Sequence, residues 1–158
     1  MPVALDVGGT KISAAVVVGA KVHERRVVAT PQPATPDSVV STVVELVRSV
    51  GGATSDVVGV AMTGRIVAGR VTAPNRATLP GWEDYPLQEV LEERLSRSLF
   101  VANDAQAAAW GEYRYGAGNR SAGGFAFVTI STGIGAGFVV GGNCLSVRAV
   151  GPGTSASP

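Results

Sequence analysis

Residues 3–30 read VALDVGGTKISAAVVVGAKVHERRVVAT, and this stretch decides the fold. Its apolar, β-branched runs at 3–7, 12–18 and 22–30 are separated only by Gly8-Gly9 and Gly19-Ala20. Runs of this kind predict β-strands, and the short breaks between them predict tight turns. Because nothing between the runs is long enough for a crossover helix, successive strands should be antiparallel neighbours. The chain therefore opens with an antiparallel meander.

The remaining periodic segments add helices and strands to this meander. Pro31, Pro33 and Pro36 end the third strand, and Asp37 is expected to cap the next helix. The further predicted elements are a helix at 37–50, a strand at 56–62, a hairpin at 65–72, a helix at 86–96, a strand at 99–102, a helix at 104–113, and strands at 125–131 and 137–140. This order differs from the strict strand–helix alternation of a Rossmann fold. The predicted fold class is α/β, a ribonuclease-H-like mixed sheet with three antiparallel strands and flanking helices.

Composition and charge limit the class of partner. The chain has 158 residues, and 13 Lys and Arg against 12 Asp and Glu leave a net charge of +1. This balance provides no basic surface for nucleic acid, so we expect a small-molecule partner. The single cysteine, Cys144, excludes an intrachain disulfide, and with the single histidine, His23, it excludes a zinc site of ordinary Cys/His composition. We find no leader peptide and no membrane-spanning run, which predicts a cytoplasmic protein.

The first predicted turn, Gly8-Gly9, is flanked by groups that suit a phosphate. Asp6 precedes it, and Thr10 and Lys11 follow it. Adjacent glycines let backbone N–H groups approach an anion, Thr and Lys add donors, and the carboxylate can hold hydrated Mg²⁺. The stretch is not a Walker A loop, because it lacks the Gly-Lys-Ser/Thr ending and the helix that follows it. A plain hairpin turn also explains the two glycines, so both interpretations stay open.

A second glycine-rich loop, STGIGAG at 131–137, lies between two apolar runs. Its alternate glycines, Gly133, Gly135 and Gly137, could present N–H groups to further phosphate oxygens, and the Thr132 hydroxyl could donate as well. A dinucleotide-binding fingerprint is excluded, because no helix pattern follows. The alternative interpretation is a hairpin whose glycines only relieve crowding.

The junction at 103–106 combines a helix start with a carboxylate. Asn103 is expected to cap the helix, with Gln106 reaching back as in a capping box. Capping explains Asn103 without any function, but it does not require Asp104, since a first-turn carboxylate gains only a few tenths of a kcal/mol from the helix dipole. A carboxylate kept ionised there suits a general base. Two glycine-rich anion loops and one such carboxylate together predict phosphoryl transfer.

These motifs resemble those of one family of sugar kinases. The residues DVGGTKISAAVV at 6–17, NDAQAAAWGEY at 103–113 and FVTISTGIGAGFVVGGN at 127–143 are similar to the ROK family, most closely to its bacterial N-acetylmannosamine kinase members. ROK glucokinases more often have Glu before the Asn-Asp pair, where this chain has Ala102. The resemblance covers about residues 3–143 and implies the actin and hexokinase type of fold.

The resemblance also implies an activity and a set of site residues. The activity is ATP-dependent phosphorylation of the 6-hydroxyl of N-acetylmannosamine, with Mg²⁺ as cofactor. Asp104 would take the proton of the attacking hydroxyl, and Asn103 would bind a neighbouring hydroxyl. The sugar pocket would include Gly64, Arg65 and, as a residue that could instead only shape its loop, Asn75. The phosphates would be held by Asp6 (through water and Mg²⁺), Gly8, Gly9, Thr10, Lys11, Thr132, Gly133, Gly135 and Gly137.

The chain departs from the family after the second glycine loop. The zinc loop of the family is absent, and residues 144–158 match neither the family nor a packed element. We therefore expect a kinase domain at 1–121, the first hairpin of a second domain at 122–143 and an off-pattern tail at 144–158 that is a frameshifted or misassigned end of a longer reading frame. The alternatives are a ROK glucokinase, a ROK transcriptional repressor and a fragment without catalytic activity. A homodimer is a further expectation.

Overall fold

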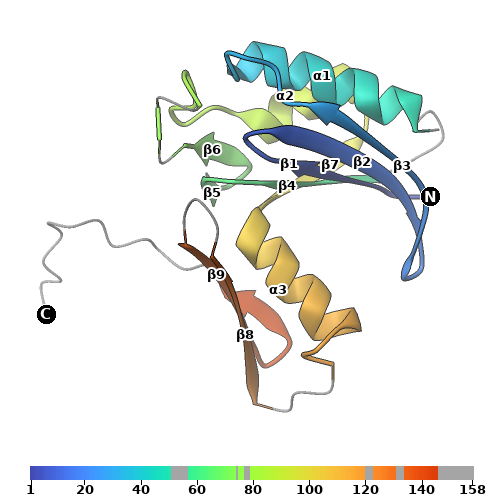
Figure 1. Ribbon diagram of the computed structural model, residues 1–158, viewed down its shortest axis with the longest axis vertical. Helices are drawn as coiled ribbons and strands as arrows, with labels where there is room; N and C mark the ends of the chain where they lie inside the picture. Colours follow the sequence, from blue (N-terminus) through green and yellow to red (C-terminus); the bar gives the residue numbers. More distant parts are fainter. Residues whose placement is uncertain (51–56, 74, 77–78, 120–122, 131–133, 146–158) are drawn as a thin grey trace, which may run out of the picture.

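The computed structural model describes residues 1–50, 57–73, 75–76, 79–119, 123–130 and 134–145 (Figure 1). The N-terminal part contains the strands and helices β1 (Val3–Val7), β2 (Lys11–Val18), β3 (Lys21–Ala29), α1 (Pro36–Ser49), β4 (Val57–Met62), β5 (Arg65–Val67) and β6 (Arg70–Thr72). The rest contains α2 (Leu87–Leu95), β7 (Ser98–Asn103), α3 (Asp104–Tyr115), β8 (Gly124–Ile130), β9 (Ile134–Val140) and β10 (Asn143–Leu145).

The main sheet has the strand order β3-β2-β1-β4-β7. β1 pairs antiparallel with β2, and β2 with β3, which confirms the predicted meander. β1 pairs parallel with β4, and β4 with β7, so the sheet is mixed. The predicted ribonuclease-H-like fold class is confirmed. Since β1, β4 and β7 are parallel, their carboxyl ends meet at one edge of the sheet, which is where ligands bind in open α/β sheets.

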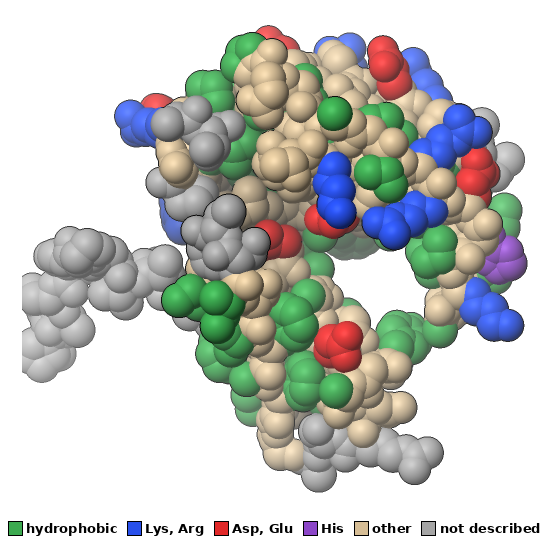
Figure 2. Space-filling model, viewed as in Figure 1, with side chains coloured by type: hydrophobic (Ala, Val, Ile, Leu, Met, Phe, Trp, Pro, Cys, Tyr) green, Lys and Arg blue, Asp and Glu red, His purple; other side chains and the backbone are tan. Residues whose placement is uncertain are grey.

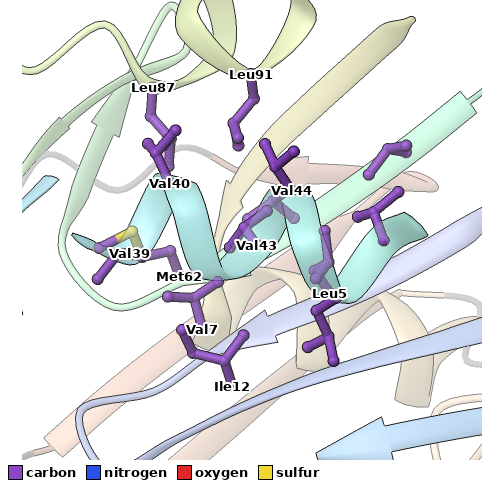
Figure 3. Packing of buried hydrophobic residues seen from close by; sticks show 14 of the residues in the cluster. Leu5, Val7, Ile12, Val39, Val40, Val43, Val44, Met62, Leu87 and Leu91 are labelled. Carbon is purple, nitrogen blue, oxygen red and sulfur yellow. The ribbon is translucent and has the colours of Figure 1, made fainter. Parts of the chain in front are cut away.

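The core lies between this sheet and the helices α1 and α2, which cover one of its faces (Figure 1). Burial alternates along β1, so that Val3, Leu5 and Val7 point to the helices. Each fully buried Val or Leu side chain contributes on the order of 1.5–3 kcal/mol to folding. Figure 3 shows the contact between the layers, formed by Leu5, Val7, Ile12 and Met62 from the sheet, Val39, Val40, Val43 and Val44 from α1, and Leu87 and Leu91 from α2.

The start of α1 differs from the prediction. The N-cap is Thr35, whose side chain accepts a hydrogen bond from the Ser38 N–H at 3.4 Å, and the prediction that Asp37 caps the helix is wrong. Pro36 explains the shift, because a proline is favoured at the first helical position and the cap then has to precede it. Asp37 instead lies in the first turn, where its charge interacts favourably with the helix dipole.

A second sheet, of strand order β10-β9-β8, packs on α3. The sequence does not predict β10, because it places Cys144 and Leu145 in the off-pattern tail. Gly141 and Gly142 have φ of 57° and 78°, the conformation of a tight hairpin turn, and the chain then returns along β9 with Leu145 opposite Phe138. The first residues of the predicted tail are therefore part of the sheet.

Candidate active site

Three of the segments that carry predicted site residues meet at the carboxyl edge of the parallel strands. β1 ends beside Asp6 and the Gly8–Lys11 turn, β4 leads into Gly64 and Arg65, and β7 ends at Asn103. The register places Asp6 opposite Ala61, and Ala61 opposite Ala102. Neighbouring strands lie about 4.8 Å apart, so β1 and β7 are roughly 10 Å apart across β4. The fold thus brings together three segments that are far apart in the sequence.

Asn103 caps α3, as predicted. Its Oδ1 accepts hydrogen bonds from the Ala105 N–H at 3.0 Å and the Gln106 N–H at 3.2 Å. The prediction that the Gln106 side chain reaches back to the cap residue, as in a capping box, is wrong. This side chain instead donates to the Leu145 carbonyl at 3.3 Å. The unexpected strand β10 provides that acceptor, which the sequence pattern did not indicate.

Asp104 is the first residue of α3 and is half-buried. Its Oδ1 accepts the Ala105 N–H at 2.8 Å. Among the described residues, no group donates a hydrogen bond to its Oδ2. One carboxylate oxygen is therefore held by the helix start, and the other is available to accept a proton from a hydroxyl group.

The Asn103 side chain also connects α3 to the turn after β4. Its Nδ2 donates to the Gly64 carbonyl at 2.9 Å. Gly64 has φ of 124°, and a Cβ there would lie 2.9 Å from the Thr72 carbonyl oxygen, so only glycine fits. This bond keeps the turn that carries the exposed Arg65 next to the start of α3. Asn75 is exposed in the loop after β6, where its carbonyl accepts the Leu79 N–H at 3.0 Å, a contact that shapes the loop.

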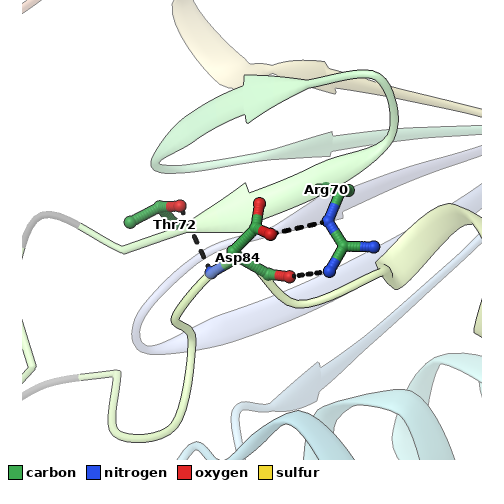
Figure 4. Close-up of polar contacts among 3 residues, drawn as sticks. All are labelled: Arg70, Thr72 and Asp84. Carbon is green, nitrogen blue, oxygen red and sulfur yellow. Dashed lines mark hydrogen bonds and ion pairs between the residues drawn. The ribbon is translucent and has the colours of Figure 1, made fainter.

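The loop that follows Asn75 is fastened to the β5–β6 hairpin by an ion pair (Figure 4). The Arg70 guanidinium donates to Asp84 Oδ2 at 2.9 Å and to the Asp84 carbonyl at 2.6 Å. The Asp84 N–H donates to Thr72 Oγ1 at 3.3 Å. No pattern in the sequence indicates these contacts, since the partners are 12 and 14 positions apart and follow no motif.

The Gly8–Lys11 turn has the features that a phosphate requires. The Gly8 N–H donates to the Lys11 carbonyl at 3.0 Å and closes the turn, and a Cβ on Gly8 would lie 3.1 Å from that same oxygen. Gly9, Thr10 and Asp6 are exposed. Within the part of the chain that the structure describes, no hydrogen bond uses the Gly9 or Thr10 N–H. Free amides and a nearby carboxylate fit the phosphates of ATP with a hydrated Mg²⁺.

The second glycine loop is described only in part. Thr132 and Gly133 lie outside the described residues. Gly137 is buried beneath α3, where a Cβ would lie 2.6 Å from the Ala109 Cβ, and a Cβ on Gly135 would lie 3.2 Å from the Ala105 Cβ. Close packing of α3 therefore accounts for glycine at these two positions, and their contact with phosphate stays a prediction.

Possible metal ligands and a groove beside α3 are two further features of this region. In the described part of the chain, no three or more His, Cys, Asp and Glu side chains cluster as a metal site would require. A groove of about 450 Å³ is lined by Ala102, Gln106, Ala107, Trp110, Gly142, Asn143 and Cys144. None of the predicted site residues lines this groove, so it provides no argument for the catalytic site.

Known proteins are similar to this chain in sequence and in fold. A model of the ROK family matches residues 2–149. The N-acetylmannosamine kinase of Pasteurella multocida is 37% identical over 137 residues, which are 87% of this chain and 46% of that protein. The bifunctional enzyme NanE/NanK of Brucella melitensis is 40% identical over 142 residues, 90% of this chain and 27% of that protein. A solved ROK glucokinase from Streptomyces griseus, in complex with glucose and AMPPNP, superposes with a TM-score of 0.81 at 33% identity and covers 93% of this chain and 46% of its own.

The chain thus spans about half of the N-acetylmannosamine kinase relative and about a quarter of the bifunctional one. It also spans about half of the glucokinase structure. In each of these three comparisons, the chain aligns with only one part of a longer protein. What those relatives bind and phosphorylate is therefore a basis for a proposal about this chain.

Proposed function

The chain belongs to the ROK family, and on that premise we propose that the protein containing it is an ATP-dependent sugar kinase acting on the 6-hydroxyl of N-acetylmannosamine. The observation that supports this proposal most is the position of Asp104. Its carboxylate opens α3 at the same sheet edge as the Gly8–Lys11 turn, with one oxygen available. The N-acetylmannosamine kinase relatives favour that sugar.

The proposed mechanism assigns each segment one task. Asp104 accepts the proton of the sugar hydroxyl. The oxygen of that hydroxyl attacks the γ-phosphorus of ATP, and the bond between this phosphorus and the ADP oxygen breaks. Gly64 and Arg65, which lie on the turn that Asn103 binds, contact the sugar. The amides of Gly9 and Thr10 bind phosphate oxygens, and Asp6 would hold Mg²⁺ through water, which offsets the charge that develops on the phosphates. The roughly 10 Å between β1 and β7 leaves room for the sugar and the transferred group between them.

A ROK glucokinase is the second candidate. The superposition on the S. griseus glucokinase at 33% identity favours it, because that structure contains glucose and AMPPNP. A coupled assay of a longer protein that contains this chain, with N-acetylmannosamine, glucose and N-acetylglucosamine side by side, separates the two. For the 158 residues alone we propose negligible turnover, since half of each kinase relative lies outside the aligned region.

The role of Asp104 is tested by substituting Asp104→Asn in the longer protein. Loss of a general base should lower kcat by about a hundred- to ten-thousand-fold with folding unchanged. Asp37→Asn is the matched control, because Asp37 is also a first-turn carboxylate, on α1, outside the site. We expect the control to keep its activity. An Asp104→Asn variant with unreduced kcat on every sugar would remove the basis of the proposal.

The proposal also includes a domain boundary, a cellular location and an oligomeric state. The boundary near residue 121 would separate a kinase domain from the start of a second domain, consistent with β8 and β9 forming a sheet of their own. No helix in the described part of the chain has the length and apolar character to cross a bilayer. A cytoplasmic location and a homodimer are proposed as well, the latter because apolar side chains of β8 and β9 are exposed.

A further inference from the structure

The segment Thr30–Gln32 lies behind the Gly8–Lys11 turn and binds its carbonyl groups. The Thr30 hydroxyl donates to the Gly8 carbonyl at 2.7 Å, and the Thr30 N–H donates to the Thr10 carbonyl at 3.0 Å. The Gln32 side-chain amide donates to the Gly9 carbonyl at a longer 3.5 Å. Three consecutive carbonyl groups of the turn are therefore engaged from the same short segment, about 22 residues away in the sequence.

The planarity of the peptide bond gives these contacts a consequence for the opposite side of the turn. In a trans peptide the C=O of one residue and the N–H of the next point in opposite directions. A Gly8 carbonyl held by Thr30 therefore directs the Gly9 N–H away from Thr30. In the same way, a Gly9 carbonyl held by Gln32 directs the Thr10 N–H away from the segment. Within the described residues no hydrogen bond uses either of these two amides.

The residues on the two sides of the turn also differ in solvent exposure. Thr30 is only 5% exposed, whereas Gly9 and Thr10 are exposed. Carbonyl oxygens would repel a phosphate. Here the Gly8 and Thr10 oxygens point toward the buried Thr30 and the Gly9 oxygen toward the exposed Gln32, whereas the Gly9 and Thr10 N–H groups point away from this segment. Glycine peptides rotate easily, so without a fixed partner the Gly8-Gly9 peptide would sample orientations that present its oxygen instead. A donor that is fixed beforehand binds an anion without a reorganisation cost.

We propose that Thr30 is a positioning residue for phosphate binding: its hydroxyl holds the Gly8 carbonyl so that the Gly9 and Thr10 amides face the phosphates of the nucleotide. Gln32 assists through Gly9. This inference rests on the proposed function, in which the turn binds ATP. It adds a residue outside the glycine motif, on the segment after β3, that acts on the ligand only through the turn.

The inference is tested by NMR on the ¹⁵N-labelled chain, following the Gly9 and Thr10 amide resonances during titration with MgATP and, separately, with magnesium tripolyphosphate. Both resonances should shift with either ligand. Thr30→Val keeps the side-chain shape and the backbone contacts but removes the hydroxyl, and it should weaken the affinity for both ligands about three- to tenfold. Thr30→Ser restores the hydroxyl and should bind within about twofold of the unsubstituted chain.

Thr42→Val is the matched control, since the Thr42 hydroxyl donates to the Ser38 carbonyl at 2.8 Å in α1, far from the turn in sequence. It loses the same kind of bond and should bind both ligands normally. Thermal unfolding of all variants separates stability from binding. A Thr30→Val variant that is less stable but binds as the unsubstituted chain does would show a structural role only and overturn the inference.

The outcomes also separate this inference from the proposed function. If neither ligand shifts Gly9 and Thr10 in the unsubstituted chain, the phosphate role of the turn fails and the inference fails with it. If the unsubstituted chain responds and Thr30→Val responds equally, only the inference fails. Should Thr30→Val not fold, Gln32→Ala serves as the second variant, because Gln32 is exposed. We expect it to bind about twofold more weakly, and unchanged binding would overturn the inference.

Discussion

Asn103 shows how one side chain can serve two purposes at the residue scale. Its oxygen satisfies two N–H groups at the start of α3, and its amide nitrogen donates to the Gly64 carbonyl. Capping alone would be served equally well by Ser, Thr or Asp. Asp has no donor, and Ser or Thr would have to accept and donate through one oxygen. Asparagine has its acceptor and its donor on separate atoms, so the second contact explains why this position suits asparagine.

Tyr85 gives a prediction about pH. Burial, and then the nearby Asp37 carboxylate, raise the pKa of its hydroxyl above the ordinary value of 10.0, while Arg94 acts in the opposite direction. The folded state therefore favours the protonated phenol. Its contribution to stability is complete below about pH 10 and is lost as the pH rises through the raised pKa.

We expect the free energy of unfolding to fall with pH in this alkaline range, and Tyr85→Phe to reduce the fall, because phenylalanine cannot ionise. Urea unfolding between about pH 9 and pH 11 measures both. Tyr115→Phe is the control, since Tyr115 is a far more exposed tyrosine at 67%. Identical pH dependence of Tyr85→Phe and the unsubstituted chain would show that Tyr85 is not the group responsible.

At the element scale, the contact between α3 and β9 depends on glycine on the strand. Gly137 lies under Ala105 and Ala109, which are small as well, so helix and strand approach closely. Gly111 lies on the same helix, but a Cβ there would meet nothing within 4 Å. Close packing against α3 therefore requires glycine at position 137, whereas no packing contact requires glycine at position 111.

Opposite effects on stability follow for two alanine substitutions. Gly137→Ala should lower the free energy of unfolding by about 1–3 kcal/mol, because the added methyl group overlaps α3. Gly111→Ala should raise it by about 0.5–1 kcal/mol, because alanine is the better helix former. Denaturant unfolding of both variants measures the difference. A Gly137→Ala variant as stable as the unsubstituted chain would contradict the close contact of α3 with β9.

At the scale of the whole molecule, the sheet β8-β9-β10 leaves its outer face uncovered by the described residues. α3 packs on its inner face, and none of its three strands contains a charged residue. Ile130 and Ile134, paired at the β8–β9 end, are 78% and 80% exposed, and Val128 and Phe138 are exposed as well. In Figure 2, green hydrophobic side chains lie along this part of the molecule. Exposed apolar patches of this kind favour association.

We expect the chain to self-associate with increasing concentration, as measured by sedimentation velocity. The double substitution Val128→Lys with Ile134→Lys should reduce association, because lysines on a strand face oppose contact with another sheet. Val67→Lys, which adds a charge at another exposed valine on β5, is the control and should leave association unchanged. If the double variant associated as strongly as the Val67→Lys control, the contact would lie outside the exposed face of β8 and β9.

The sequence by itself determined the features that depend on neighbours along the chain. Apolar, β-branched runs and glycine turns predicted the β1–β3 meander, and Asn103 predicted the cap of α3. Each of these signals is local, because strand and helix periods and turn preferences act over a few residues. Local reasoning was wrong where two local signals competed, as at Thr35, Pro36 and Asp37.

Only the tertiary structure decided what depends on residues that are distant in sequence. The meeting of the Gly8–Lys11 turn, Gly64 and Asp104 at one edge follows from the parallel pairing of β1, β4 and β7. The contacts of Thr30 with Gly8 and of Asn103 with Gly64 span 22 and 39 residues. Such contacts carry no periodic pattern, since they arise when strands that are far apart in the chain become neighbours in the sheet. The sequence could therefore name candidate groups for phosphoryl transfer, whereas their placement required the packed sheet.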